Sequence, residues 1–192
     1  FPGYKSGGIA RTILNTVDWL GDEFEFFIIT RDRDLGADQP YEGIECGVWL
    51  DHGKSKVQYL SPKELSLRSL LRIFSKYKFD IIHLNSFFDS VFTIKLLLLV
   101  RCGFFDPRKL VLSPRGEFVE GPLRIKYFKK SFYIKLSRFF GFYKKVFWHA
   151  SSKHEADGII KAMSIPASAV HLAIDLPIKE SVAIEPGVAK DG

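Results

Sequence analysis

The chain has 192 residues, with 28 Lys and Arg against 22 Asp and Glu, a formal net charge of +6 and 46% hydrophobic residues. This ordinary globular composition excludes wholesale disorder, and the length predicts one domain with a tail. The two cysteines, Cys46 and Cys102, lie far apart and outside any CxxC pair. The sequence therefore predicts no zinc site or redox pair and fits a reducing compartment.

No segment of the sequence predicts a membrane span or a signal peptide. The most apolar run, residues 91–100, is interrupted by Lys95 and is shorter than the roughly 20 residues that a span requires. The chain opens on Phe1-Pro2-Gly3 rather than on a basic stretch followed by an apolar core. We expect a cytoplasmic location, which agrees with the reducing compartment that the two lone cysteines fit.

Short apolar runs alternate with longer periodic segments along the chain. Helices are expected at residues 9–20, 62–74, 89–102, 122–147 and 152–163, and strands at 24–30, 56–60, 79–84, 110–112, 146–150 and 170–174. Residues 36–55 predict an excursion from this pattern, and residues 178–192 predict a linker or tail. Strands that alternate with helices imply parallel pairing, so we expect an α/β domain with a doubly wound parallel sheet over residues 1–177.

The segment 122–147 combines basic and aromatic side chains and contains no acid. Its eight cations are Arg124, Lys126, Lys129, Lys130, Lys135, Arg138, Lys144 and Lys145. This mixture at helical spacing favours a helix on an anionic membrane surface, with the first four cations facing lipid. Single-stranded nucleic acid is one alternative, and a helix with core aromatics and solvated lysines is the other. The lack of acids favours the membrane, and we expect no nucleic-acid partner.

Polar residues follow successive predicted strands. His83, Asn85 and Ser86 close one strand, residues 113–117 (Ser-Pro-Arg-Gly-Glu) follow the next, and residues 151–152 follow a third. Ligands of open α/β sheets bind beyond the carboxyl ends of the strands, so we expect these residues in one pocket. For His83 alone, a structural role and a functional role both remain open.

Two further patterns suit anions or metals. Gly7 and Gly8 lie directly before the first predicted helix, where backbone N–H groups can approach an anion, although a plain tight turn explains them equally well. The guanidinium of Arg115 can bind two oxygens of a phosphate or carboxylate at once. The acids of Asp32-Arg33-Asp34 are typical of a solvated turn, and we expect no metal there.

In order along the chain, the segments FPGYKSGGIARTI, FDIIHLN, VLSPRGEF, WHASSKHEADGI and AIDLP resemble the amino-terminal domain of family 4 glycosyltransferases with the GT-B fold. The resemblance covers residues 1–177. It implies a Rossmann-like domain that receives the acceptor and faces a second domain, which binds a nucleotide sugar. The implied reaction transfers the sugar with retention, without a metal or cofactor. It also implies a lipid-linked or glycan acceptor, surface polysaccharide synthesis, and a location peripheral to the inner face of the plasma membrane.

The resemblance also implies roles for individual residues. The expected site comprises catalytic His83 and Arg115, donor-phosphate and cleft residues Gly7, Gly8 and Gly116, and acceptor residues Asn85, Ser86 and Glu117. Glu155 matches a recurrent acid in the family. Arg115 stands where many relatives place a histidine.

The sequence departs from the family pattern in three ways. Relatives carry an apolar strand directly before the glycine loop, and a sheet without that central strand has two unpaired edges. Leu172-Ala173 replaces the usual Asn-Gly, and the second domain is not part of this sequence. We therefore expect no turnover by this chain alone. A non-catalytic α/β module that binds a membrane or nucleic acid through residues 122–147 is the alternative function.

Overall fold

The computed structural model describes residues 7–119 and 127–179. Five α-helices lie in these ranges: α1 (Gly7–Leu20), α2 (Leu67–Lys76), α3 (Leu96–Arg101), α5 (Tyr127–Phe139) and α6 (Lys153–Met163). The strands there are β1 (Phe26–Arg31), β2 (Trp49–His52), β3 (Ser55–Leu60), β4 (Ile81–Asn85), β5 (Lys109–Ser113), β6 (Val146–Ala150) and β7 (Val170–Leu172). Shorter helical turns cover Pro62–Glu64, Ser90–Lys95 and Ala167–Ala169.

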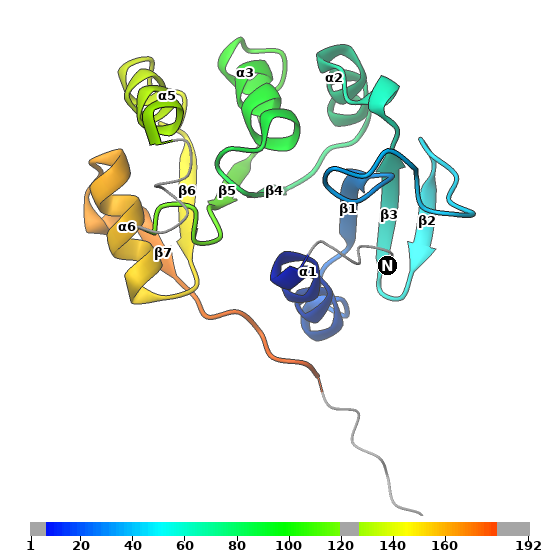
Figure 1. The fold of residues 1–192 in the computed structure, drawn as a ribbon. Helices are drawn as coiled ribbons and strands as arrows, with labels where there is room; N and C mark the ends of the chain where they lie inside the picture. The colour runs from blue at the N-terminus through cyan, green and yellow to red at the C-terminus, as the bar shows by residue number, and fades with distance from the viewer. Residues whose placement is uncertain (1–6, 120–126, 180–192) are drawn as a thin grey trace, which may run out of the picture.

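The strands form two sheets, and every pairing in them is parallel except that of β2 with β3. Strands β4, β5, β6 and β7 pair in that order, all parallel, and β3 pairs with β1 in parallel and with β2 in antiparallel. Helices lie on both sides of the strands (Figure 1). The chain therefore has an α/β, Rossmann-like fold, as the sequence predicts.

The two sheets end on strands that face each other without pairing. Strands β1 and β4 occupy the facing ends, and in residues 7–119 and 127–179 neither has a partner on that side (Figure 1). The two unpaired edges expected from the sequence are thus present. One further parallel strand between β1 and β4 would join the seven strands into a single sheet.

A shared helical layer holds the two sheets together. One core cluster joins Leu60 of β3 to Leu70 of α2 and Leu99 of α3, and the larger cluster surrounds Trp148 of β6. An ion pair between Arg31, at the end of β1, and Asp89, after β4, spans 2.8 Å and adds a polar connection. The sheets therefore form one body although their strands are not paired.

The polypeptide covers the two faces of the parallel sheet unequally. Strands β4–β7 pack against α3, α5 and α6, and the buried side chains Ile82 and Leu84 of β4 point to that side. The other side carries α1, along which the end of the described chain runs: Asn15 donates to Leu176 O (2.8 Å) and the Trp19 indole to Pro177 O (2.9 Å). The alternate β4 residue His83 therefore lies on the more open side.

Several predicted elements differ in detail from the observed ones. A short strand, β2, lies within the predicted excursion 36–55. The helix predicted at 89–102 begins as a π-helical turn, in which Ile94 N–H donates to the Asp89 carbonyl five residues earlier. The Asp89 carboxylate caps the N–H groups of Val91 and Phe92 at the start of this turn. The helix predicted to reach residue 147 ends at Phe139, and the chain then turns at Gly141 (φ +63°). Residues 122–126 lie outside the described ranges. Within those ranges, no helix is long and apolar enough to cross a bilayer.

Candidate functional site

The carboxyl ends of β4, β5, β6 and β7 lie on one edge because the four strands are parallel. Strand β4 and the loops after β4 and β5 carry the predicted site residues other than Gly7 and Gly8. Two loop residues other than glycine, Ser86 (φ 82°) and Arg115 (φ 56°), adopt the left-handed backbone region. Such strained conformations persist only where surrounding contacts enforce them and are typical of functional loops.

Arg115 is held at this edge by partners from two other strands. Its Nε donates to Asn85 Oδ1 at 3.0 Å, and its Nη1 lies 2.8 Å from Asp175 Oδ1. The Arg115 side chain is 10% exposed and that of Asp175 is 40% exposed. A guanidinium has five N–H donors, so two contacts leave donors for a further oxygen. Asp175 occupies a position where an anionic ligand would meet the arginine.

Gly7 and Gly8, predicted to lie before the first helix, are instead the first two residues of α1, and this helix contacts the same region. The Thr12 hydroxyl of α1 lies 3.4 Å from Asp175 Oδ2, so one carboxylate contacts both α1 and Arg115. Gly7 and Gly8 lie about one turn before Thr12 and are exposed at the helix start. Gly7 has φ +57°, which favours glycine.

A chain of hydrogen bonds crosses three neighbouring strands on the α1 side. His83 Nε2 lies 2.7 Å from Ser113 Oγ, Ser113 Oγ lies 2.6 Å from His149 Nδ1, and His149 Nε2 lies 2.9 Å from the Ala173 carbonyl. A carbonyl only accepts, so His149 Nε2 carries a proton. When both rings are neutral, His149 Nδ1 accepts from the Ser113 hydroxyl, which in turn accepts from His83 Nε2–H. This order leaves His83 Nδ1 as a hydrogen-bond acceptor.

His83 is neutral at physiological pH. His83 as a whole residue is exposed at the unpaired edge of β4. Its ring nevertheless has protein atoms around it, and these replace part of the water that would stabilise the charged form. This desolvation, together with the charge of Arg115, lowers the pKa of His83 to about 4. The carboxylate of Asp175 acts weakly in the opposite direction. A neutral imidazole can orient a hydroxyl group through Nδ1.

Two other predicted site residues bind to each other rather than facing open space. Glu117 Oε1 accepts from the Ser86 hydroxyl at 2.7 Å, and Oε2 accepts from the backbone N–H groups of Phe87 and Phe88. These contacts fix the loop after β4 in its left-handed turn at Ser86. The structure therefore places Ser86 and Glu117 at the predicted edge, where they act as loop supports.

Glu155 ties the next two loops together from α6. The residue is only 5% exposed; one carboxylate oxygen accepts from Gly116 N (2.7 Å), and the other accepts from Ser151 N (2.8 Å) and Ser151 Oγ (2.9 Å). Gly116 has φ +75°, a conformation that suits glycine. The acid thus sets the path of the backbone directly after Arg115.

The edge brings together most of the predicted site residues and adds two that sequence reasoning missed. They are His149, which extends the hydrogen-bond chain from His83 through Ser113, and Asp175, which pairs with Arg115. A usable signal existed for His149, because it precedes the end of its strand by one residue in a run otherwise apolar.

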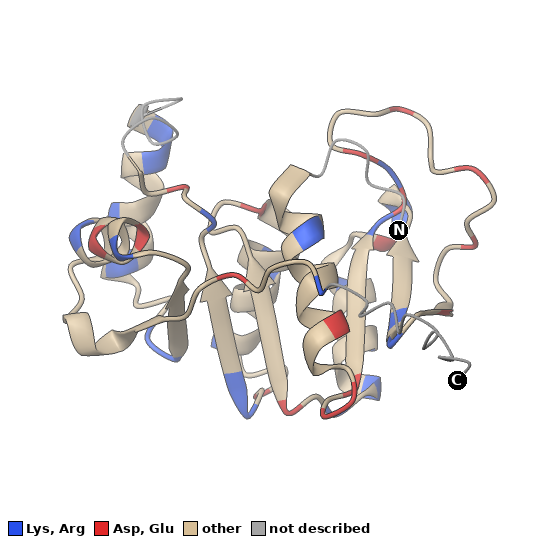
Figure 2. Cartoon of the chain, turned by 90° about the horizontal axis from the view of Figure 1, so that it is seen from below, with Lys and Arg blue, Asp and Glu red and all other residues tan. Residues whose placement is uncertain are grey.

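Charged side chains also gather away from this edge: acids follow the loop between β1 and β2, and cations gather on α5 (Figure 2).

The predicted membrane residues lie in different surroundings. Lys129 is exposed on α5, whereas Lys130 is partly buried with its Nζ 4.8 Å from the centre of the Phe88 ring. Arg124 and Lys126 lie outside the described residues. Lys130 therefore points towards the body of the domain rather than away from it.

The fold and this edge define a Rossmann-like α/β protein with an arginine, a neutral histidine and a carboxylate at the position where such sheets bind ligands. A scan against protein-family models and a search of curated proteins both give no match for this chain. The resemblance seen in the sequence motifs therefore stays a prediction.

Proposed function

We propose that this chain is the acceptor-binding half of a retaining glycosyltransferase that moves a sugar from a nucleoside diphosphate to a lipid-linked glycan in surface polysaccharide synthesis. The observation that supports this most is the convergence of Arg115, His83 and the start of α1 at the carboxyl edge. The ordered sequence motifs support the same reaction class. Under this proposal a second domain binds the nucleotide sugar across a cleft.

Arg115 is the residue that we assign to the donor diphosphate. Its present partner, Asp175, is 40% exposed and offers the oxygen geometry that a phosphate would offer. Backbone N–H groups at Gly7 and Gly8 add donors on the same side. As the sugar–phosphate bond breaks, negative charge grows on the leaving diphosphate, and fixed donors stabilise that charge without a general acid.

His83 is the residue that we assign to the acceptor. Its neutral ring can accept a hydrogen bond from a sugar hydroxyl at Nδ1, while Nε2–H stays engaged with Ser113. The chain through Ser113 and His149 fixes the ring orientation and tautomer. The role of His83 in this proposal is to hold the hydroxyl in position beside the donor sugar.

The basic helix α5 is the element that we assign to membrane binding. We propose that α5 lies against an anionic membrane, because a lipid-linked acceptor is found there and the helix carries cations without acids. The protein would then be peripheral to the inner face of the plasma membrane.

The decisive test is sugar transfer by the chain joined to the second domain that the proposal requires. We expect radiolabelled sugar to pass from one of a panel of nucleoside diphosphate sugars into a lipid extract, and Arg115→Ala to lower kcat/KM by about a hundredfold or more. Arg108→Ala is the matched control, since Arg108 is an exposed arginine paired only with exposed Asp80. No transfer from any donor, or near-normal transfer by Arg115→Ala, would overturn the proposal.

A further inference from the structure

Helix α5 carries a row of exposed aromatic rings on its outer face. Phe128, Phe132 and Phe139 are 88%, 66% and 83% exposed. At 100° per residue they lie within roughly 40° of one another around the helix axis, so they form one stripe, which we call the aromatic stripe. Exposed apolar rings grouped on one surface mark a binding site far more often than rings scattered singly.

The inner face of the same helix is ordinary core. Ile134 and Ser137 are buried, and Tyr133 packs against the main cluster, where its hydroxyl bonds that of Tyr143 at 2.8 Å. The interpretation of this helix as core aromatics with solvated lysines therefore accounts for one face only. The aromatic stripe is additional apolar surface, which is exposed as far as the described residues define it.

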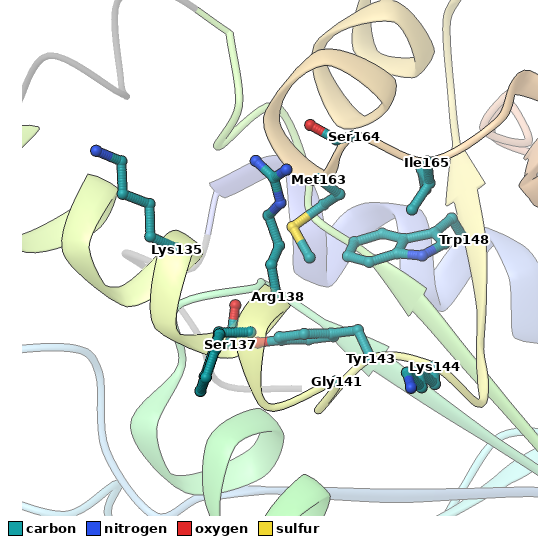
Figure 3. A pocket seen from close by; sticks show the side chains of 11 residues that line it. Lys135, Ser137, Arg138, Gly141, Tyr143, Lys144, Trp148, Met163, Ser164 and Ile165 are labelled. Carbon is teal, nitrogen blue, oxygen red and sulfur yellow. The ribbon is translucent and has the colours of Figure 1, made fainter.

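A cavity opens beside the aromatic stripe, between α5 and α6. Its volume is about 670 Å³, and Tyr143, Trp148 and Met163 supply apolar walls. The guanidinium of Arg138 reaches across from α5 towards Met163 and the end of α6, as Figure 3 shows. Lys144 lines the same cavity from the turn after α5. Lys135 is a third cation of the lining, so the cavity combines apolar walls with three cations, of which Arg138 and Lys144 lie nearest the turn after α5.

The cations of this cavity lie outside the ion pairs found in residues 7–119 and 127–179. No carboxylate of the described residues forms an ion pair with Arg138 or Lys144. Phe139 belongs to both features, because it lines the cavity and also completes the aromatic stripe. The cavity and the aromatic stripe therefore form one continuous surface.

We infer that the cavity between α5 and α6 binds the phosphate headgroup of an anionic membrane lipid, while the aromatic stripe enters the headgroup boundary beside it. Arg138 can bind two phosphate oxygens as a fork, and Lys144 adds a point charge. The apolar walls suit the first carbons of the lipid, and aromatic rings are favoured at the depth where headgroups meet acyl chains. This inference rests on the proposed membrane role of α5 but not on glycosyl transfer.

The test is co-sedimentation of the 192-residue chain with vesicles of equal parts phosphatidylcholine and phosphatidylglycerol. The chain should bind these vesicles and not pure phosphatidylcholine. Arg138→Gln/Lys144→Gln should reduce the partition coefficient by about tenfold or more, since both cations are attracted to the anionic surface. Lys63→Gln/Lys161→Gln is the matched control, because it removes the same charge from exposed residues elsewhere and should change binding by less than about threefold.

A second measurement separates a lipid site from a simple anion site. We expect the Trp148 indole resonance in NMR spectra to shift on titration with short-chain phosphatidylglycerol and to stay in place with inorganic phosphate alone. The reverse result, or a shift of equal size with both, would overturn the lipid assignment. Trp49 is an internal control, since it lies on β2 in the other sheet.

The outcomes distinguish this inference from the proposals before it. If Phe128→Gln/Phe132→Gln abolishes vesicle binding and Arg138→Gln/Lys144→Gln does not, α5 meets the membrane but the headgroup cavity is wrong. If the unmodified chain binds no vesicle, the membrane role of α5 and the headgroup cavity are both wrong. Salt-sensitive binding to a single-stranded oligonucleotide would then favour a nucleic-acid partner instead. A failed sugar-transfer assay affects neither result.

Discussion

The carboxyl edge of the parallel sheet and the outer face of α5 differ in whether their side chains are bonded within the domain or exposed to water. At the edge, the polar groups of Arg115, Glu117 and Glu155 are bonded to other parts of the protein. On the outer face of α5, the rings of Phe128 and Phe139 remain exposed to water. The polar groups of the edge are thus bonded within the domain, whereas the rings on the outer face of α5 form apolar surface in contact with water.

This difference shows where a ligand would gain or lose free energy. An anion at the edge must compete with Asp175 for Arg115, so binding there depends on good geometry. A surface that covers the aromatic stripe removes apolar area from water and breaks no internal contact of the domain. The edge is therefore suited to selectivity, and the outer face of α5 to attachment.

The largest effect should come from removing the carboxylate that organises the edge. Glu155→Ala leaves the N–H groups of Gly116 and Ser151 without their acceptor, so the free energy of unfolding should fall by about 3 kcal/mol. Urea denaturation followed by circular dichroism measures it. The control is Asp157→Ala on the same helix, where an exposed pair with Lys153 contributes under about 0.5 kcal/mol. Equal losses in both variants would show that the edge is not held by Glu155.

A smaller and more specific effect concerns the charge of His83. Its pKa of about 4 lies below the ordinary 6.5, so the unfolded chain takes up this proton first as the pH falls. The contribution of His83 to stability is therefore complete above pH 6.5 and is lost as the pH falls towards 4. An NMR titration of the imidazole should show the low pKa directly. Arg115→Gln should raise the pKa and Asp175→Asn should lower it, because the two charges act in opposite directions.

An ordinary titration near 6.5 in the unmodified chain would contradict this description of the edge. It would mean that the ring is solvated and that Ser113 does not fix it through Nε2.

The elements that sequence reasoning predicted best are those specified by local interactions. The bounds of β6 are the predicted ones, and α6 begins after Ser152, whose side chain accepts from Glu155 N as a helix cap. Strand β2 was missed because its four residues lie in a Gly-rich segment and gain their order only by pairing with β3. The unpaired edges of β1 and β4 were expected from the resemblance, because relatives carry an apolar strand before the glycine loop.

The site was predicted less completely because it depends on register between strands. His149 meets Ser113 only because β6 is aligned with β5 so that Trp148 pairs with Leu112, and no local pattern specifies that alignment. Asp175 reaches Arg115 across 60 residues of sequence. The orientation of α5 could not be predicted from the sequence either, because aromatic residues occur on all of its sides and only packing decides which of them are covered.

The smallest expected effect on stability concerns the exposed rings of α5. Phe128→Gln/Phe132→Gln should leave the free energy of unfolding within about 0.5 kcal/mol of the unmodified chain, because both rings are exposed and glutamine suits a helix. Ile134→Ala, on the buried face of the same helix, should cost about 3 kcal/mol. Thermal and urea unfolding measure both. If the Gln pair destabilised the domain as strongly as Ile134→Ala, the aromatic stripe would be part of the core, and a membrane would have no apolar surface on α5 to cover.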